Sequence, residues 1–313
     1  MRALLCPASL KGVLSAQAAA AALARGVREA GSEAVELPVA DGGEGTAEAL
    51  VAALGGEWSY AHVADPLGRQ IRARFLVLDD GTVVVEAAAA IGLPLLAEDE
   101  RDPLRASSRG LGELLLAALS EKPQRLLVAL GGTATMDGGA GLRQVVDSLP
   151  VPTLALCDVR TRLADAARVF GPQKGASPAD VVVLEGRLAA MDAVRPFAEL
   201  PGSGAAGGLG AALASLGAEL VPGAPAVLDL VGFDARLAGC DLVVTGEGRV
   251  DATTVEGKVP GEVARRADRA GVRCVVFGGL VDLELDEVET VALSGDPAAA
   301  EADLVALGTR LAA

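Results

Sequence analysis

Charged side chains follow a short buried strand in the segment 241–258, DLVVTGEGRVDATTVEGK. An apolar run ending at Thr245 predicts the strand, and a helix is expected after the segment. Of the charged residues between them, we take Glu247, Arg249, Asp251 and Lys258 as candidates for chemistry. Ligands of parallel α/β sheets bind beyond the carboxyl ends of the strands, where helix N-termini offer unpaired N–H groups to anions. The pattern therefore indicates a site for an anionic small molecule.

Lysine is rare in this chain, and its positions are informative. Four lysines stand against 23 arginines. Lys11, Lys174 and Lys258 each adjoin a glycine, whereas Lys122 precedes Pro123 in an expected loop. The compact lysine ammonium suits a phosphate, while the planar arginine fork suits bidentate contacts. Chance placement is the alternative, but we interpret the three glycine-flanked lysines as cations for phosphate or carboxylate groups.

Two glycine-rich loops also follow expected strands. The first, Asp41-Gly42-Gly43-Glu44-Gly45-Thr46, opens a helix, and a plain glycine turn capped by Thr46 is its simpler interpretation. The second, 131–141, holds five glycines, two threonines and the carboxylate of Asp137. Glycines let backbone N–H groups approach an anion closely, as a phosphate cradle requires. The chain contains no G-x-x-x-x-G-K-[ST] motif, so this cradle is not of the Walker type.

Acidic residues near the ends of expected strands supply oxygen donors of the kind that Mg²⁺ prefers. They are Asp41, Glu44, Asp137, Asp158, Glu247 and Asp251.

These residues must be positioned by alternating strands and helices. The hydrophobic patterns change after Gly55-Gly56, where short strands are joined by Asp65-Pro66-Leu67-Gly68 and Asp79-Asp80-Gly81, the turns of antiparallel pairs. A second domain is therefore expected to begin there. Expected strands are Ala3–Cys6, Val35–Val39, Trp58–Val63, Ile71–Leu78, Val83–Ala87, Leu126–Leu130, Thr153–Cys157, Leu242–Thr245 and Val272–Phe277. Helices are expected near 15–30, 46–54, 110–119, 178–191 and 261–270, before Leu216, and from about 297.

Composition limits the function classes. The 313 residues, 51% of them hydrophobic, can bury a large core and suit two domains. The net charge of −15 argues against nucleic acid and anionic membranes as partners. No apolar run of about 18 residues and no signal-peptide pattern occur, so we expect a cytoplasmic protein. The single histidine, His62, excludes a histidine-dependent triad, and the four scattered cysteines are expected to be small buried thiols.

With these motifs assembled, the chain resembles the bacterial type I glycerate kinases. The motifs that carry the resemblance are Ser9-Leu10-Lys11-Gly12, 41–46, Asp65-Pro66-Leu67-Gly68, 131–141, 170–176, 204–210 and 245–258. The resemblance implies phosphorylation of D-glycerate, usually to 2-phosphoglycerate, with ATP and Mg²⁺. It also implies a flavodoxin-like (Rossmann-like) parallel α/β domain built from both chain ends, 1–57 plus 228–313, with a second mixed α/β domain, 58–227, inserted.

Roles for the candidate residues follow from combining this class with their chemistry, because phosphoryl transfer requires positioning, charge neutralisation and a proton acceptor. The catalytic candidates are Lys11, Asp137, Asp251 and Lys258. Asp137 and Asp251 are the candidates for accepting the proton of the glycerate hydroxyl, and Arg249 has the fork to grip the glycerate carboxylate. The candidates for binding substrate or phosphate are Ser9, Gly42, Gly43, Gly131, Gly132, Thr133, Lys174 and Arg249. The metal candidates are Asp41, Glu44, Asp158 and Glu247.

Departures from the family pattern leave alternatives open. Ala8, Met136 and Thr253 stand where the family pattern has Asp, Asn and Gln. The chain could phosphorylate another small hydroxy acid, or be a nucleotide-binding relative without transfer activity. A metal-dependent phosphatase would not explain the three glycine-flanked lysines. Aromatic residues make up 2% of the chain, so we expect adenine to meet aliphatic walls, and a homodimer is one assembly open to the protein.

Overall fold

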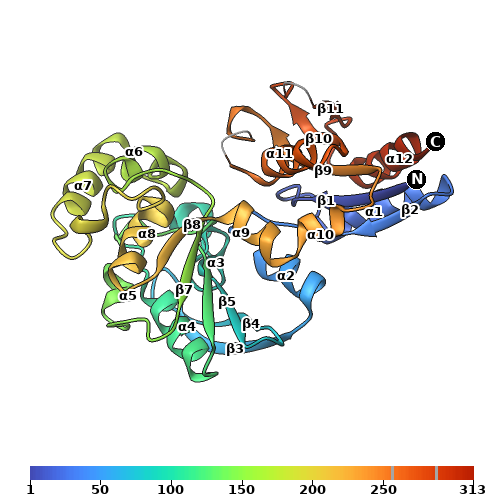
Figure 1. The fold of residues 1–313 in the computed structure, drawn as a ribbon. Coiled ribbons are helices and arrows are strands. Elements are labelled where there is room, and N and C mark those ends of the chain that lie inside the picture. The colour runs from blue at the N-terminus through green and yellow to red at the C-terminus, as the bar shows by residue number, and fades with distance from the viewer. Residues whose placement is uncertain (255–256, 286–287) are drawn as a thin grey trace. The chain divides into compact units, whose positions relative to one another are not determined.

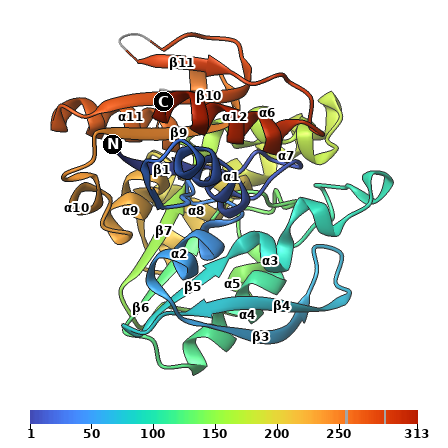
Figure 2. The same cartoon turned by 90° about the vertical axis from the view of Figure 1, so that its right-hand side faces the viewer.

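A computed structural model describes residues 1–254, 257–285 and 288–313, which form two compact units (Figures 1 and 2). Unit 1 contains Met1–Asp41, Glu48–Leu54 and Ala224–Ala313. Unit 2 contains Gly42–Ala47 and Gly55–Gly223. Both chain ends therefore belong to one unit, and the loop 42–47 is grouped with the other.

Unit 1 is built on a parallel sheet with the strand order β11-β10-β9-β1-β2. Its strands are β1 (Arg2–Pro7), β2 (Glu33–Glu36), β9 (Leu242–Val250), β10 (Arg273–Val281) and β11 (Glu289–Ala292). Its helices are α1 (Ala16–Glu29), most of α2 (Thr46–Leu54), α9 (Gly223–Leu230), α10 (Phe233–Leu237), α11 (Val259–Ala270) and α12 (Ala300–Ala312). Leu5 and Val244 pack in one core with α1 and α12, whereas Val250 and Val276 pack in another with α11. Helices on both faces of a parallel sheet confirm the expected flavodoxin-like class.

Unit 2 is built on a mixed sheet with the strand order β3-β4-β5-β6-β7-β8. Its strands are β3 (Glu57–Ala64), β4 (Gln70–Val77), β5 (Thr82–Glu86), β6 (Arg125–Ala129), β7 (Thr153–Cys157) and β8 (Glu219–Pro222). Its helices are α3 (Ala87–Ile91), α4 (Arg109–Ser120), α5 (Ala140–Arg143), α6 (Ala166–Phe170), α7 (Pro178–Ala189) and α8 (Ala205–Ser215). The β3–β4 and β4–β5 pairs are antiparallel, as their turn sequences predicted, and the remaining pairs are parallel.

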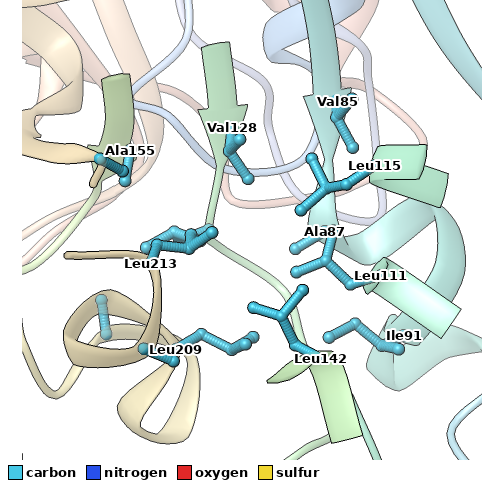
Figure 3. Packing of buried hydrophobic residues seen from close by; sticks show 14 of the residues in the cluster. Val85, Ala87, Ile91, Leu111, Leu115, Val128, Leu142, Ala155, Leu209 and Leu213 are labelled. Atoms are coloured by element: carbon cyan, nitrogen blue, oxygen red, sulfur yellow. The ribbon is translucent and has the colours of Figure 1, made fainter. Parts of the chain in front are cut away.

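The core of unit 2 lies between the sheet and the helices α4, α5 and α8 (Figure 3). Val85 and Val128 come from the strands, and Leu111, Leu142 and Leu213 come from the three helices. All five side chains are fully buried. The apolar residues of the strands and helices thereby fix the strand ends that carry the polar loops.

Local signals explain several element boundaries. The hydroxyl of Ser15 accepts a hydrogen bond from the Ala18 N–H at 3.1 Å, which makes Ser15 the N-cap of α1. Gly271 ends α11 in the left-handed conformation, with a φ of 67°. Three of the cysteines are buried and the fourth, Cys274, is partly buried, and none forms a disulfide.

Strand β9 is longer than the sequence predicted. The apolar run ends at Thr245, but the strand continues to Val250 because β10 pairs with it as far as Val281. Gly246 permits this pairing, since a Cβ at that position would lie 2.3 Å from the Phe277 carbonyl oxygen. Glu247 and Arg249 are therefore strand residues rather than loop residues. The predicted end of this strand at Thr245 was therefore wrong.

No helix in the described ranges is long and apolar enough to cross a membrane.

Close packing of α1 against α12 gives a stability prediction. A Cβ at Gly26 would lie 2.0 Å from the Val305 carbonyl oxygen, so Gly26→Ala should force the helices apart. We expect this change to lower the free energy of unfolding by about 1–3 kcal/mol. Gly186→Ala in α7 is the matched control, because a Cβ there meets nothing within 4 Å and should stabilise the helix by up to about 1 kcal/mol. Urea unfolding followed by far-ultraviolet circular dichroism measures both, and an unchanged midpoint for Gly26→Ala would contradict the packing.

Candidate functional site

In unit 1, chemistry-bearing residues gather near the carboxyl ends of the parallel strands. Ser9 and Lys11 follow β1, Asp41 follows β2 by a few residues, and Asp251 directly follows β9. Gly248 in β9 lies against the first of these loops, since a Cβ there would be 3.6 Å from the Lys11 backbone nitrogen. The structure thus brings the Lys11 loop beside the charged end of β9.

Glu247 and Lys258 form the centre of this first cluster. Their carboxylate and ammonium groups are 3.4 Å apart, and Lys258 Nζ lies 3.9 Å from the Asp251 carboxylate. The Thr254 hydroxyl donates to Glu247 at 2.8 Å and accepts from the Asp251 N–H at 3.0 Å. Burial raises the pKa of the Glu247 carboxyl, while Lys258 and Thr254 oppose this shift and Asp41 adds to it. Within this segment, Val255 and Glu256 lie outside the described residues.

Arg249 has a different neighbour. Its guanidinium forms an ion pair with Asp282 at 2.6 Å, and both side chains are substantially exposed. A substrate carboxylate would have to compete with Asp282 for this fork. This contact has no local signal in the sequence, because Asp282 follows a different strand, β10.

In unit 2, the ends of the parallel strands β5, β6 and β7 carry a second cluster. Glu86 ends β5 and accepts a hydrogen bond from the Ala47 N–H at 3.0 Å, which ties the loop 42–47 to the sheet. A Cβ at Gly131 would lie 2.6 Å from the Gly43 Cα and 2.9 Å from a carboxylate oxygen of Asp158. Only glycine permits this approach of the two loops and the acid.

The same loops carry the other predicted binding residues of unit 2. Gly42 and Gly132 both adopt positive φ angles, of 90° and 77°. A Cβ at Gly132 would lie 3.8 Å from a Glu44 carboxylate oxygen. The Thr46 hydroxyl donates to the Gly43 carbonyl at 2.7 Å and so closes the first loop, as a capping threonine would. The ends of the strands thus form a glycine-lined cradle edged by Glu44 and Asp158.

Lys174 enters this second cluster from a single 3-10 turn, Pro172–Lys174, and is only 4% exposed. Its ammonium donates to the Thr133 hydroxyl at 3.2 Å and to the Thr135 carbonyl at 2.9 Å. Burial lowers the pKa of Lys174 to about 7, and the charges of Asp158 and Asp137 oppose the shift. The Thr135 hydroxyl is itself buried and has no hydrogen-bond partner among the described residues. A buried cation beside an unsatisfied hydroxyl is suited to an anionic or polar ligand group.

Asp137 is held by four donors. One carboxylate oxygen accepts from the Ser108 N–H, the Ser108 hydroxyl and the Gly141 N–H, and the other accepts from the Gly139 N–H, at 2.8–3.1 Å. The Ser108 hydroxyl in turn accepts from the Leu142 N–H at 2.9 Å. Sequence reasoning missed Ser108, although a serine pair before the expected helix 110–119 offered a signal. Asp137 therefore anchors the glycine loop to the start of α4.

The structure shows the surroundings of Met136 and Ala8, two of the residues at which the expected family pattern is not met. Met136 is 1% exposed and belongs to the hydrophobic core of unit 2, beside Gly207. Ala8 donates its N–H to the Gly246 carbonyl at 2.9 Å, so the backbone of that loop remains tied to β9. Close packing also accounts for the glycines of α8, since a Cβ at Gly207 would lie 2.2 Å from the Thr135 carbonyl oxygen.

Metal candidates are present in both units. Asp41 and Glu247 belong to unit 1, and Glu44 and Asp158 belong to unit 2. Within the described ranges, no three His, Cys, Asp or Glu side chains are grouped as a metal site of protein ligands alone. Mg²⁺ is commonly held by one or two carboxylates together with substrate phosphates, so this carboxylate chemistry still fits it.

Two α/β units with charged glycine loops at the ends of parallel strands define an enzyme of the α/β class with loops suited to anions. The Glycerate kinase family profile matches residues 3–148 and 149–296. The chain belongs to the glycerate kinase family, as the sequence motifs predicted.

Relatives with established names support this assignment. The chain is 39% identical to a glycerate 2-kinase of Escherichia coli K12, over 86% of this chain and 82% of that protein. It is 38% identical to a glycerate kinase of Bacillus subtilis 168, over 92% of this chain and 87% of that protein. A crystal structure from Salmonella typhimurium LT2, described provisionally as glycerate kinase 2, matches with a TM-score of 0.85 and 33% identity, over 100% of this chain and 97% of that one.

The burial of Lys174 predicts a pH dependence of stability. Its pKa is about 7 in the folded protein and 10.5 in a model compound, so between these values the unfolded chain binds a proton that the folded chain does not. The free energy of unfolding should therefore rise with pH over this window, by up to about 1.4 kcal/mol per pH unit from this residue. The Lys174→Met variant has no ammonium group, so its free energy of unfolding should not show this rise with pH. Urea unfolding at pH 7, 8 and 9, followed by Trp58 fluorescence in unit 2, compares the two proteins, and parallel pH profiles would contradict the burial of the ammonium.

Proposed function

We propose that the protein is an ATP-dependent kinase that phosphorylates D-glycerate on its 2-hydroxyl group. The observation that carries the proposal is the family assignment, together with relatives named glycerate 2-kinase and glycerate kinase that align with most of the chain. The clusters at the strand ends support it, because they combine lysines, glycine-lined backbone and carboxylates.

The lysines supply the positive charge that the phosphates and the glycerate carboxylate require. At about 4 Å and an effective dielectric constant near 20, one lysine contributes a Coulomb attraction of about 4 kcal/mol to a unit negative charge. Charges beyond the screening length of about 8 Å contribute little, so the charges close to a ligand decide whether an anion binds. In unit 1, Lys11 and Lys258 are proposed to fill this role, with the backbone of Ser9 as a further donor; in unit 2, Lys174 is proposed to fill it, with the backbone of Gly131–Thr133.

Asp251 is the better of the two candidates for the proton acceptor. Both oxygens of Asp137 already accept hydrogen bonds from within unit 2, so protonation of Asp137 would disturb the loop that it anchors. The Asp251 side chain is 32% exposed and lies 3.9 Å from the Lys258 ammonium. In the proposed step, the glycerate oxygen attacks the γ-phosphorus, the bond to the bridging oxygen breaks, the hydroxyl proton passes to Asp251, and ADP leaves.

Carboxylates are the proposed ligands for Mg²⁺, and the candidates are Asp41 and Glu247 in unit 1 and Glu44 and Asp158 in unit 2. When bound, the ion would neutralise charge on the phosphates of ATP. Glu247 also orients Lys258 and Thr254 through the contacts described above, which positions the ammonium independently of any metal. Adenine is proposed to meet aliphatic side chains and backbone groups, because aromatic residues are scarce.

The direct test is release of ADP from ATP and Mg²⁺ in the presence of acceptors. We expect turnover with D-glycerate at least tenfold above that with L-glycerate, lactate or glycerol, and no release without an acceptor. Equal or greater turnover with another hydroxy acid would identify that acid, rather than D-glycerate, as the substrate. Binding of ATP without any acceptor-dependent turnover would indicate a nucleotide-binding relative that lacks transfer activity.

Removal of a candidate cation gives a second prediction. Lys258→Met should reduce kcat/KM at least a hundredfold, because it removes the charge that neutralises phosphate and pairs with Glu247 and Asp251. Lys122→Met is the matched control, since Lys122 lies in an exposed turn after α4, and its turnover should stay within twofold of the parent. Circular dichroism establishes that both variants fold. Near-normal kcat/KM for Lys258→Met would remove this lysine from the proposed machinery.

A further inference from the structure

Thr135, in the glycine-rich loop 131–141, is an exception among the buried threonines of this protein. Its side chain is 0% exposed, and its hydroxyl has no hydrogen-bond partner in the described part of the chain. The other threonines that the structure describes as buried all use their hydroxyls in hydrogen bonds, and these are Thr46, Thr82, Thr133, Thr153, Thr245 and Thr254. A buried hydroxyl without a partner costs stability that a valine of the same shape would avoid. A partner from outside the chain is therefore expected.

Lys174 has unused hydrogen-bonding capacity at the same place. Its side chain is 4% exposed and donates to the Thr133 hydroxyl and to the Thr135 carbonyl. A protonated lysine has three N–H donors, so one donor has no acceptor within the described ranges. Because one of the two acceptors is the carbonyl of Thr135 itself, the spare N–H and the unsatisfied hydroxyl belong to neighbouring groups. A ligand with several acceptor atoms can satisfy both.

The backbone around Thr135 is held firmly by the rest of unit 2. The Ala134 N–H donates to the last carbonyl of α3 at 2.8 Å. Gly207 of α8 packs against the Thr135 carbonyl so closely that a Cβ would lie 2.2 Å from its oxygen. Gly132 is exposed and Asp137 is partly exposed, so the loop reaches solvent on both sides of Thr135. The unsatisfied hydroxyl thus belongs to a fixed segment of a loop that a ligand can approach.

The chemistry of this group favours a phosphate. The compact lysine ammonium suits a phosphate, whereas a carboxylate is better matched by the planar arginine fork. A phosphate group presents three acceptor oxygens, enough for the ammonium, the hydroxyl and N–H groups of the glycine-lined loop. Burial lowers the pKa of Lys174 to about 7, and an anion beside it stabilises the protonated form that has the third donor.

We propose that the Thr135 hydroxyl and the third N–H of Lys174 bind oxygens of one phosphate group of ATP. The choice of ATP rests on the proposed function, whereas the two buried groups require only phosphate chemistry. Thr135 is thereby a further substrate-binding residue, which the sequence analysis did not single out. In this role its hydroxyl lowers the stability of the protein and raises its affinity for ATP. A hydroxyl with a purely structural role would act on stability alone.

Thr135→Val separates these roles, because it removes the hydroxyl with little change of shape. We expect the urea midpoint of unfolding without ligand to rise, since no unsatisfied hydroxyl remains buried. The dissociation constant for ATP with Mg²⁺, measured by calorimetry, should rise at least about tenfold, because a hydrogen bond to a charged group is lost. The dissociation constant for D-glycerate should stay within about twofold. Thr135→Ser keeps the hydroxyl and should bind ATP within about threefold of the parent.

Thr153→Val is the matched control. Thr153 is 3% exposed at the start of β7, and its hydroxyl donates to the Val151 carbonyl at 2.9 Å. Loss of this satisfied hydroxyl should lower the urea midpoint and leave the ATP dissociation constant within about twofold. An unchanged ATP dissociation constant for Thr135→Val overturns the proposal. A lowered midpoint or a failure of Thr135→Val to fold also overturns it, because either result indicates an internal partner such as a buried water.

These outcomes are distinguishable from a failure of the proposed function. A parent that transfers phosphate to D-glycerate, but whose affinity for ATP does not depend on Thr135, contradicts this inference alone. A parent that binds ATP through Thr135 without acceptor-dependent turnover supports the inference and contradicts the proposed function. A parent that does not bind ATP overturns the inference, and so does Thr135→Val if it weakens only the binding of D-glycerate.

Discussion

Parallel strand pairing is the constraint on which the rest of this structure depends. Parallel strands end at the same side of a sheet, so residues far apart in the chain meet there. In unit 2 this pairing places Glu86, Gly131 and Asp158, from the ends of three neighbouring strands, around one cradle. In unit 1 it places the Lys11 loop beside the charged end of β9. The apolar strand cores supply the stability, and the loops carry the chemistry.

Burial of charge is the energetic cost of these clusters. Lys174 is almost completely buried with two neutral acceptors, and its lowered pKa reflects that desolvation. Burial likewise raises the pKa of the Glu247 carboxyl, and the charge of Lys258 opposes this shift. Such groups destabilise the fold unless a ligand or partner charge meets them, so each cluster is suited to a charged ligand.

Much of the fold could be predicted because its signals are local. Ser15 marks the start of α1, and the turn sequences of β3–β5 identify antiparallel pairs. The extension of β9 could not be predicted, because pairing with β10 overrides the weak strand preference of Gly246–Arg249. Four-residue strands such as β8 and β11 have too little pattern to recognise. In the candidate site, residue types identified Lys174 and Asp137, but only tertiary contacts reveal the burial of Lys174 and the four donors that hold Asp137.

Met136, at a position where the family resemblance implies an asparagine, illustrates how the candidate site and the core are joined. Its side chain packs into the core of unit 2 while the neighbouring Asp137 keeps its polar contacts. The loop can therefore retain its shape without the asparagine, which is consistent with retained transfer to glycerate. Phosphorus NMR of the product formed from ATP and D-glycerate tests this claim most directly. A new phosphate doublet, coupled to the single proton on C2, is the predicted result, whereas a triplet from the two protons on C3, or no phosphoglycerate signal, would contradict it.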